Sequence, residues 1–116
     1  MNAPAAHDRL LEVRTYLLKD GMRAQFDRVM AEQAIPMLHA VGMDVVAHGR
    51  SDHERETRFL IRAYRDRNDL ESQQKAFYGS VAWREGPRQA LIDCIDTYLN
   101  TLLWMPAGAV DSLRTK

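Results

Sequence analysis

The chain has 116 residues, 46% hydrophobic and 28% charged, and its sixteen basic residues balance its sixteen acidic ones. This length allows one domain with one hydrophobic core, and the zero net charge argues against a nucleic-acid-binding protein, which needs a clustered positive face. A single cysteine, Cys94, excludes a disulfide scaffold, and its apolar surroundings favour a buried structural thiol over a reactive one.

Residues 1–9 are predicted to be a disordered N-terminal segment. They lack the basic stretch followed by an apolar run that marks a secretory signal. No apolar stretch of about 18 residues that would span a bilayer occurs in the sequence. We therefore expect a cytoplasmic protein with no membrane partner.

Residues 10–18 have the alternating pattern of a β-strand. One face carries Leu11 and Val13 and is expected to be core, while the other carries Glu12, Arg14 and Tyr16 and is amphipathic. The sequence Lys19-Asp20-Gly21 then predicts a turn.

Residues 22–39 change to a helical period, and Gly42 is a natural end for that helix. Pro36 lies inside the pattern, so it either kinks the helix or starts a new turn near Ala34. Residues 43–49 and 57–65 predict two further strands joined by a polar hairpin loop.

The order Asn68-Asp69-Leu70-Glu71 predicts a capping box that opens a second helix, which stops at Gly79. Ser80 is expected to cap a further turn, and Pro87 to begin the helical stretch from residue 88 to about 95. Residues 97–104 predict a fourth strand, and residues 106–116 a loose C-terminal arm.

This order of elements predicts an α+β, ferredoxin-like βαββαβ domain with a four-stranded antiparallel sheet and helices on one face. The other face would be bare and too apolar for water. It is expected to carry, besides fourth-strand residues, Tyr16, Leu18, Val46, Leu60 and Tyr64. Packing two such sheets together covers it, so we expect the protein's partner to be a second copy of itself, in a homodimer.

The segment Tyr78–Arg88, YGSVAWREGPR, joined to the opening strand Glu12–Tyr16, EVRTY, resembles the NIPSNAP family. The resemblance extends over residues 10–105. It implies a dimeric α/β barrel, in which two ferredoxin-like sheets close into one barrel. Relatives by fold include cofactor-free oxygenases and small isomerases, and the resemblance itself names no substrate.

Several polar residues would share one wall of this sheet, because its first and third strands are adjacent. Glu12, Arg14 and Tyr16 would face Arg62 and Tyr64. His48 would lie one strand further out. Such a wall could bind an anionic or enolic ligand, with arginine supplying donors for an oxyanion and a phenol or imidazole moving a proton. The alternative is a structural network inside the barrel, in which Glu12 neutralises the two arginines.

Trp83 and Arg88 complete the candidate ligand-binding residues. An aromatic ring beside a cation suits a flat ligand, although such rings are also common core anchors. The four histidines show no metal-ligand spacing and the six glycines no phosphate-binding loop, so we expect neither a metal nor a cofactor.

Two functions therefore compete. The first is a small-molecule binding protein or cofactor-independent enzyme, oxygenase- or isomerase-like, with a pocket for a small apolar or aromatic ligand. The alternative is a non-catalytic homodimeric interaction module. No residue is assigned a catalytic role from the sequence.

Overall fold

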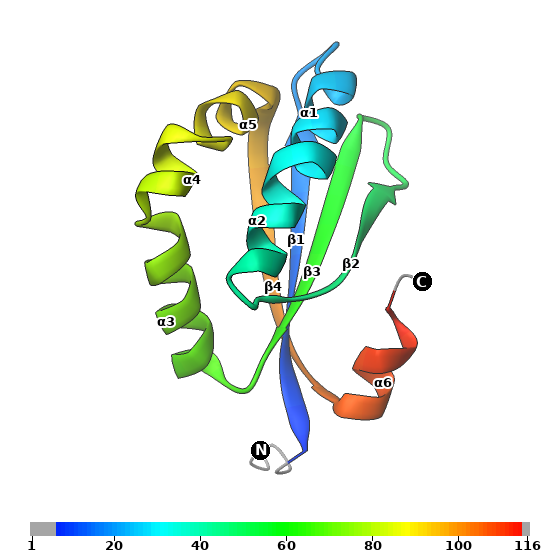
Figure 1. The fold of residues 1–116 in the computed structure, drawn as a ribbon. Helices are drawn as coiled ribbons and strands as arrows, with labels where there is room; N and C mark the ends of the chain where they lie inside the picture. The colour runs from blue at the N-terminus through cyan, green and yellow to red at the C-terminus, as the bar shows by residue number, and fades with distance from the viewer. Residues whose placement is uncertain (1–6, 115–116) are drawn as a thin grey trace.

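The computed structural model describes residues 7–114, which form a four-stranded antiparallel sheet in the order β2-β3-β1-β4 with helices between the strands (Figure 1). The strands are β1 (Asp8–Leu18), β2 (Asp44–Ser51), β3 (Thr57–Tyr64) and β4 (Ile95–Pro106). The helical segments are α1 (Arg23–Val29), η1 (Met30–Ala34), α2 (Ile35–Ala40), α3 (Arg67–Tyr78), α4 (Val81–Glu85), α5 (Arg88–Cys94) and α6 (Ala107–Ser112). The predicted ferredoxin-like order is confirmed.

The two faces of the sheet are the reverse of the prediction. Four residues expected on the bare face pack under the helices: Tyr16, Leu18, Leu60 and Tyr64. Val46 does lie on the other face of the sheet, away from helices α1 to α5, which is called the far face below. Leu11, which was expected in the main core, lies there too. Alternation along β1 separates the two sets correctly, but it cannot tell which set the helices cover. Here they cover the more polar one.

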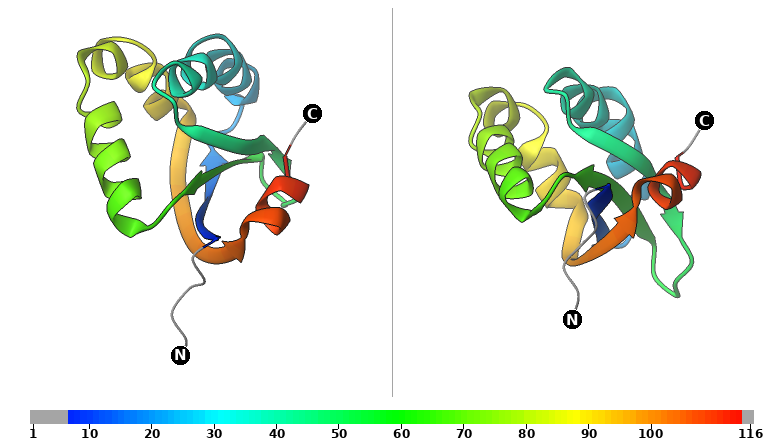
Figure 2. Two further views of the ribbon diagram at one scale, coloured as in Figure 1. Left: turned by 60° about the horizontal axis from the view of Figure 1, so that its bottom comes forward. Right: turned by 90° about the horizontal axis from the view of Figure 1, so that it is seen from below.

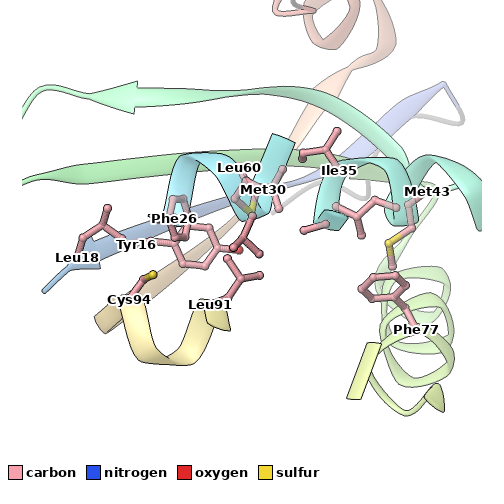
Figure 3. Close-up of a cluster of buried hydrophobic side chains, with 13 residues drawn as sticks. Tyr16, Leu18, Phe26, Met30, Ile35, Met43, Leu60, Phe77, Leu91 and Cys94 are labelled. Carbon is pink, nitrogen blue, oxygen red and sulfur yellow. The ribbon is translucent and has the colours of Figure 1, made fainter. Parts of the chain in front are cut away.

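The main core fills the space between this sheet face and the helices (Figure 3). Phe26 and Met30 come from the first helical segment, and Phe77 and Leu91 from the second. Cys94 is fully buried among them, as predicted for a structural thiol, and burial raises the pKa of that thiol.

Pro36 starts a new helical turn rather than breaking the first helical segment. The π-helical stretch η1 directly precedes α2, and Pro36 lies at the start of α2. Proline cannot donate a backbone hydrogen bond and crowds the carbonyl four residues earlier, and a wider π turn is one way to accommodate such a misfit. Gly42, with φ of +81°, follows the end of α2 as predicted.

The cap of helix α3 lies two residues before the predicted one. Asp66 accepts a hydrogen bond from the Asp69 amide at 2.8 Å, so Asn68 lies inside the helix and is not its cap. Ser80 does cap α4, accepting from the Trp83 amide at 3.2 Å.

Helices α3, α4 and α5 form an arc along one side of the sheet (Figure 1). The bend between α4 and α5 requires Gly86, because a Cβ atom there would lie 2.4 Å from the carbonyl oxygen of Ala82. This arc brings Tyr78 at the end of α3 and Trp83 in α4 over the polar residues of the sheet.

Both ends of the described chain are more ordered than predicted. Strand β1 already includes Asp8, while residues 1–6 lie outside the described residues. The expected loose arm forms α6, which lies at the opposite side of the sheet from α3 (Figure 2). Val110 is fully buried on the far face, and Arg114 binds the Asp44 carboxylate at 2.7 and 3.0 Å.

The far face remains partly open beyond α6. Val13, Phe59 and Ile61 are only partly buried there. On β4, Leu99 and Leu103 pair with β1 residues of the same face and are 65% and 43% exposed. An apolar strip of the sheet, interrupted on β4 by Thr101, is therefore accessible.

Candidate functional site

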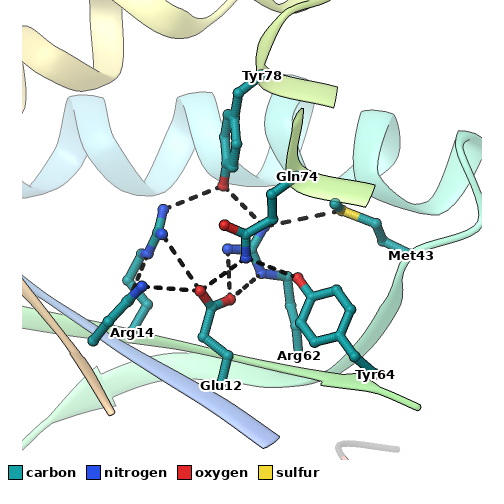
Figure 4. Close-up of polar contacts among 8 residues, drawn as sticks. Glu12, Arg14, Met43, Arg62, Tyr64, Gln74 and Tyr78 are labelled. Atoms are coloured by element: carbon teal, nitrogen blue, oxygen red, sulfur yellow. Dashed lines mark hydrogen bonds and ion pairs between the residues drawn. The ribbon is translucent and has the colours of Figure 1, made fainter. Parts of the chain in front are cut away.

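A buried ionic cluster lies under the arc of helices, centred on Glu12 (Figure 4). Its Oε1 accepts a hydrogen bond from Arg62 Nε at 2.8 Å, and Arg62 Nη2 lies 2.7 Å from the same oxygen as an ion pair. Its Oε2 accepts from Gln74 at 2.9 Å, from Asn100 at 3.0 Å and, at 3.4 Å, from Arg14. All of these contacts arise from the sheet register, which places Glu12 opposite Arg62, and from α3.

Tyr78 closes the cluster from the helix side. Its hydroxyl oxygen accepts hydrogen bonds from Arg62 Nη1 at 2.9 Å and from Arg14 Nη1 at 3.2 Å. Both guanidinium carbons also lie within 6 Å of the ring centroid, at 5.7 and 5.8 Å. The Tyr78 oxygen thus accepts hydrogen bonds from two cationic side chains.

Arg14 reaches from this cluster to the edge strand. Its Nε donates to Asn100 Oδ1 at 2.8 Å, and its guanidinium lies 5.0 Å from the ring centroid of Tyr98. Its side chain is 13% exposed, whereas those of Glu12 and Arg62 are fully buried. Among the charged side chains of the cluster, Arg14 is therefore the one that contacts solvent.

The cluster carries a net positive charge. Burial lowers the pKa of Arg62, but the neighbouring phenols and Glu12 outweigh that effect and the pKa stays above its usual value. Arg14 behaves in the same way. Burial raises the pKa of Tyr16 to about 12 with help from Tyr78, and that of Tyr64 to about 12, so both phenols are neutral at neutral pH. Two guanidiniums thus face one carboxylate.

A cavity of about 650 Å³ opens beside the cluster, between the arc of helices and the edge of the sheet. This volume falls in the usual range of small-molecule sites. Its lining mixes aromatic, aliphatic and charged side chains: Arg14, Tyr16, Gln74, Tyr78, Trp83, Arg88, Leu91, Ile92, Ile95, Asp96, Thr97 and Tyr98. The charged lining residue of β4, Asp96, is paired with Arg55 at 3.0 Å.

The structure brings most of the predicted site residues together. Glu12, Arg62 and Tyr64 lie in or against the cluster, and four others line the cavity: Arg14, Tyr16, Trp83 and Arg88. The prediction that Arg14 and Arg62 share one face of the sheet is confirmed, since both donate to Glu12 and Tyr78.

His48 is not part of this arrangement. It lies opposite Leu60 on β2, after a register shift between Val45 and Ala47. There it lines a separate cavity of about 320 Å³, next to Phe26 and other residues of the first helical segment. As predicted, it shares the sheet face of Leu60 and Arg14 and lies one strand beyond β3, but it is not among the described residues that line the cavity beside the cluster.

Several residues of the site were missed in the sequence. Gln74 and Asn100 supply the neutral donors to Glu12, and Tyr98 lines the cavity beside Arg14. Asn100 follows from one signal, namely that it lies on the same face of the fourth strand as Tyr98. Nothing in the local sequence distinguishes Gln74 from the other polar residues of α3.

Neither a metal site nor a membrane span is found in the described part of the chain. Residues 7–114 contain no group of three or more histidine, cysteine, aspartate or glutamate side chains placed to hold a metal ion. Over the same residues, no helix has the length and apolar character needed to cross a membrane.

The fold and site define a ferredoxin-like α+β domain with an ionic cluster at a cavity under its helices. Its fold is that of NIPSNAP structures. A NIPSNAP family protein of unknown function from Agrobacterium tumefaciens superposes with a TM-score of 0.79 at 19% identity, over 89% of this chain and 93% of that one. A NIPSNAP-like domain protein from Burkholderia xenovorans gives 0.76 at 17% identity, over 85% of both chains.

A second kind of neighbour shares the fold. A putative antibiotic biosynthesis monooxygenase from Nitrosomonas europaea superposes with a TM-score of 0.66 at 13% identity, over 88% of this chain and 93% of that one. No family model and no curated protein matches the sequence. The comparisons thus show the fold, in agreement with the NIPSNAP resemblance of the sequence, and leave the activity to be argued from the site.

Proposed function

We propose that this protein binds a small molecule in the cavity beside Arg14 and Tyr78 and acts on it without a cofactor. The observation that carries this proposal is the meeting of a net-positive buried cluster with a cavity of about 650 Å³. A guanidinium can stabilise a developing oxyanion, and a phenol can donate or accept a proton. Isomerase- and oxygenase-like reactions that pass through an enolate need a group that stabilises the oxyanion and a group that transfers a proton.

The charge balance argues against a purely structural network. Burying a charge without a partner costs several kcal/mol, so a network that serves stability alone would pair its charges one to one. Here the second guanidinium, that of Arg14, shares Glu12 with Arg62, has no other carboxylate partner within residues 7–114, and lines the cavity. A ligand anion would supply the missing partner.

We propose further that two copies associate through the far face of the sheet. Leu99 and Leu103 are exposed on that face beside the partly buried Val13, Phe59 and Ile61. An apolar strip of this kind is a usual mark of an interface. The same strip favours the alternative function, an interaction module with no reaction of its own, so the two functions differ only at the cavity.

Native mass spectrometry of the purified protein, combined with a thermal-shift panel of aromatic and quinone-like compounds, tests this proposal. We expect a dimer, and an adduct or a stabilising compound that is lost in Arg14→Gln and kept in Arg84→Gln. Arg84 is the matched control, because it is an exposed arginine of α4 outside the cavity lining. A folded protein that carries no adduct, and that no compound stabilises, would contradict ligand binding and favour the interaction module.

A further inference from the structure

Resting on the proposed function, we infer that the ligand is a planar aromatic monoanion, whose oxyanion is bound jointly by the guanidinium of Arg14 and the hydroxyl of Tyr78. The argument depends on unused hydrogen-bond donors, on charge and on the shape of the lining.

Arg14 has a donor to spare. A guanidinium has five N–H groups, and within residues 7–114 those of Arg14 donate to Asn100, Tyr78 and Glu12, with Tyr16 as a further side-chain hydrogen-bond partner. The bond to Glu12 is long, at 3.4 Å. One N–H group therefore remains on a side chain that lines the cavity, which suits an anionic oxygen.

The Tyr78 hydroxyl has one hydrogen to donate. Its oxygen accepts from both Arg14 and Arg62, and within residues 7–114 no group accepts its own hydrogen. Two cationic donors polarise the O–H bond and make it a better donor. Since Tyr78 lines the same cavity as Arg14, the two can reach one ligand oxygen.

The charges of the cluster and of the cavity lining favour a ligand with a single negative charge. The cluster has one positive charge in excess, and the carboxylate of Asp96 at the cavity is already paired with Arg55. Arg88 lines the cavity and makes no ion pair within residues 7–114, and it is exposed, so solvent screens it. A monoanion neutralises the buried excess, whereas a dianion would bring a second charge that only this screened residue could meet.

The remaining lining favours a flat ring system. Tyr78 and Trp83 meet edge to face with ring centroids 5.2 Å apart, and Tyr98 stands across Arg14 on β4. Aliphatic residues of α5, Leu91 and Ile92, complete the wall. Aromatic side chains prefer stacked or edge-on ring partners, so a planar ligand gains more here than a saturated one of equal volume.

Isothermal titration of three matched probes tests the inference: 2-naphthoate, its neutral isostere 2-naphthamide, and the saturated decahydro-2-naphthoate. We expect 2-naphthoate to bind at least about tenfold more tightly than 2-naphthamide, the factor that one charge-assisted hydrogen bond supplies. We expect it to bind at least about threefold more tightly than decahydro-2-naphthoate, which keeps the carboxylate and loses the aromatic ring contacts. Amide chemical-shift changes should map to the cavity residues.

Two variants separate the roles of the donors. Tyr78→Phe keeps the ring and removes the hydroxyl, and we expect about tenfold weaker 2-naphthoate binding with a smaller change for 2-naphthamide. Arg14→Gln should weaken 2-naphthoate at least as much, and Arg84→Gln should leave it within about twofold. Amide spectra establish that each variant is folded.

The outcomes distinguish the inference from the function on which it rests. Equal binding of all three probes at the cavity would overturn the aromatic-anion inference and leave the ligand-binding function standing. Binding of 2-naphthoate that none of the variants weakens would overturn the roles of Arg14 and Tyr78. If none of the probes binds, the inference fails, and native mass spectrometry with the thermal-shift panel decides the proposed function.

Discussion

Glu12 and Arg62 stand directly opposite each other on β1 and β3, and both side chains are completely shielded from solvent. Both oxygens of the carboxylate accept hydrogen bonds, from the two guanidiniums and from the neutral amides of Gln74 and Asn100. The arrangement holds Arg62, and through it the Tyr78 hydroxyl, in one place. Glu12 and Arg62 are therefore positioning residues for the groups that line the cavity.

Glu12→Gln should destabilise the protein by about 3–5 kcal/mol, the usual cost of leaving a buried charge unpaired. Glutamine has the same shape, so no cavity forms. Its amide nitrogen, however, would face the donors of Gln74 and Asn100, and two guanidiniums would lose their only carboxylate. Urea denaturation measures the free energy of unfolding.

Glu85→Gln is the control, because Glu85 is an exposed residue of α4 outside the cavity lining. It should change the free energy of unfolding by less than about 0.5 kcal/mol. A similarly small change in Glu12→Gln would show that the cluster does not depend on the carboxylate charge.

Two glycines should respond to alanine in opposite directions. Gly86→Ala places a methyl group 2.4 Å from the Ala82 carbonyl oxygen, so the bend between α4 and α5 must shift, at a cost of about 1–3 kcal/mol. Gly108 lies in α6 with no atom within 4 Å of the added carbon, and Gly108→Ala should stabilise by up to about 1 kcal/mol.

Thermal melts of the two variants, compared with the unmodified protein, check this pair. Since Gly86 shapes the arc that carries Trp83 over the cavity, we also expect Gly86→Ala to weaken any cavity ligand. An unchanged melting temperature in Gly86→Ala would mean that the bend relaxes freely and does not set the cavity.

How far the sequence predicts this site depends on strand register. The alternation in β1 and the adjacency of β1 and β3 correctly place Arg14 and Arg62 on one face. Alternation is symmetric, however, so it could not show that the helices cover the Glu12 face and leave Leu11 on the other. Neither could it foresee the register shift between Val45 and Ala47, after which His48 pairs with Leu60, or that His48 lines a different cavity on that face.

Two residues that donate to Glu12, Asn100 and Gln74, were not predicted. Asn100 is fixed by its pairing opposite Arg14, which a fourth-strand register would provide. Gln74 reaches Glu12 because α3, capped by Asp66, begins the arc of helices over the sheet. That placement is a property of the tertiary packing, and local sequence does not contain it.

Alkaline pH should weaken the fold over a defined range. The pKa of Tyr16 and that of Tyr64 are raised to about 12, against a usual value near 10. Above pH 10 the unfolded chain loses these protons while the folded protein keeps them, so stability is complete below pH 10 and falls as pH rises towards 12. For the fully buried Tyr16 the loss is on the order of 2 kcal/mol.

Tyrosinate absorbance during an alkaline titration, paired with urea denaturation at each pH, measures both effects. Two of the four tyrosines should ionise near pH 12 while the protein remains folded. In Tyr16→Phe, the slope of stability against pH should be shallower between pH 10 and 12. Ionisation of all four tyrosines near pH 10 in the folded protein would contradict the burial of these phenols.

The last prediction concerns the far face of the sheet. Leu103→Lys introduces a charge into the exposed apolar strip on the edge strand β4, opposite Leu11 on β1. If a second copy covers this strip, the lysine must be desolvated there, and the dimer should dissociate to monomers at micromolar concentration. Light scattering after size-exclusion chromatography measures the mass.

Val81→Lys is the control, because Val81 is equally apolar and 58% exposed but lies at the start of α4, away from the strip. It should leave the dimer intact. A monomer mass for the unmodified protein, or a dimer that tolerates lysine at position 103, would show that the sheets do not associate through this face.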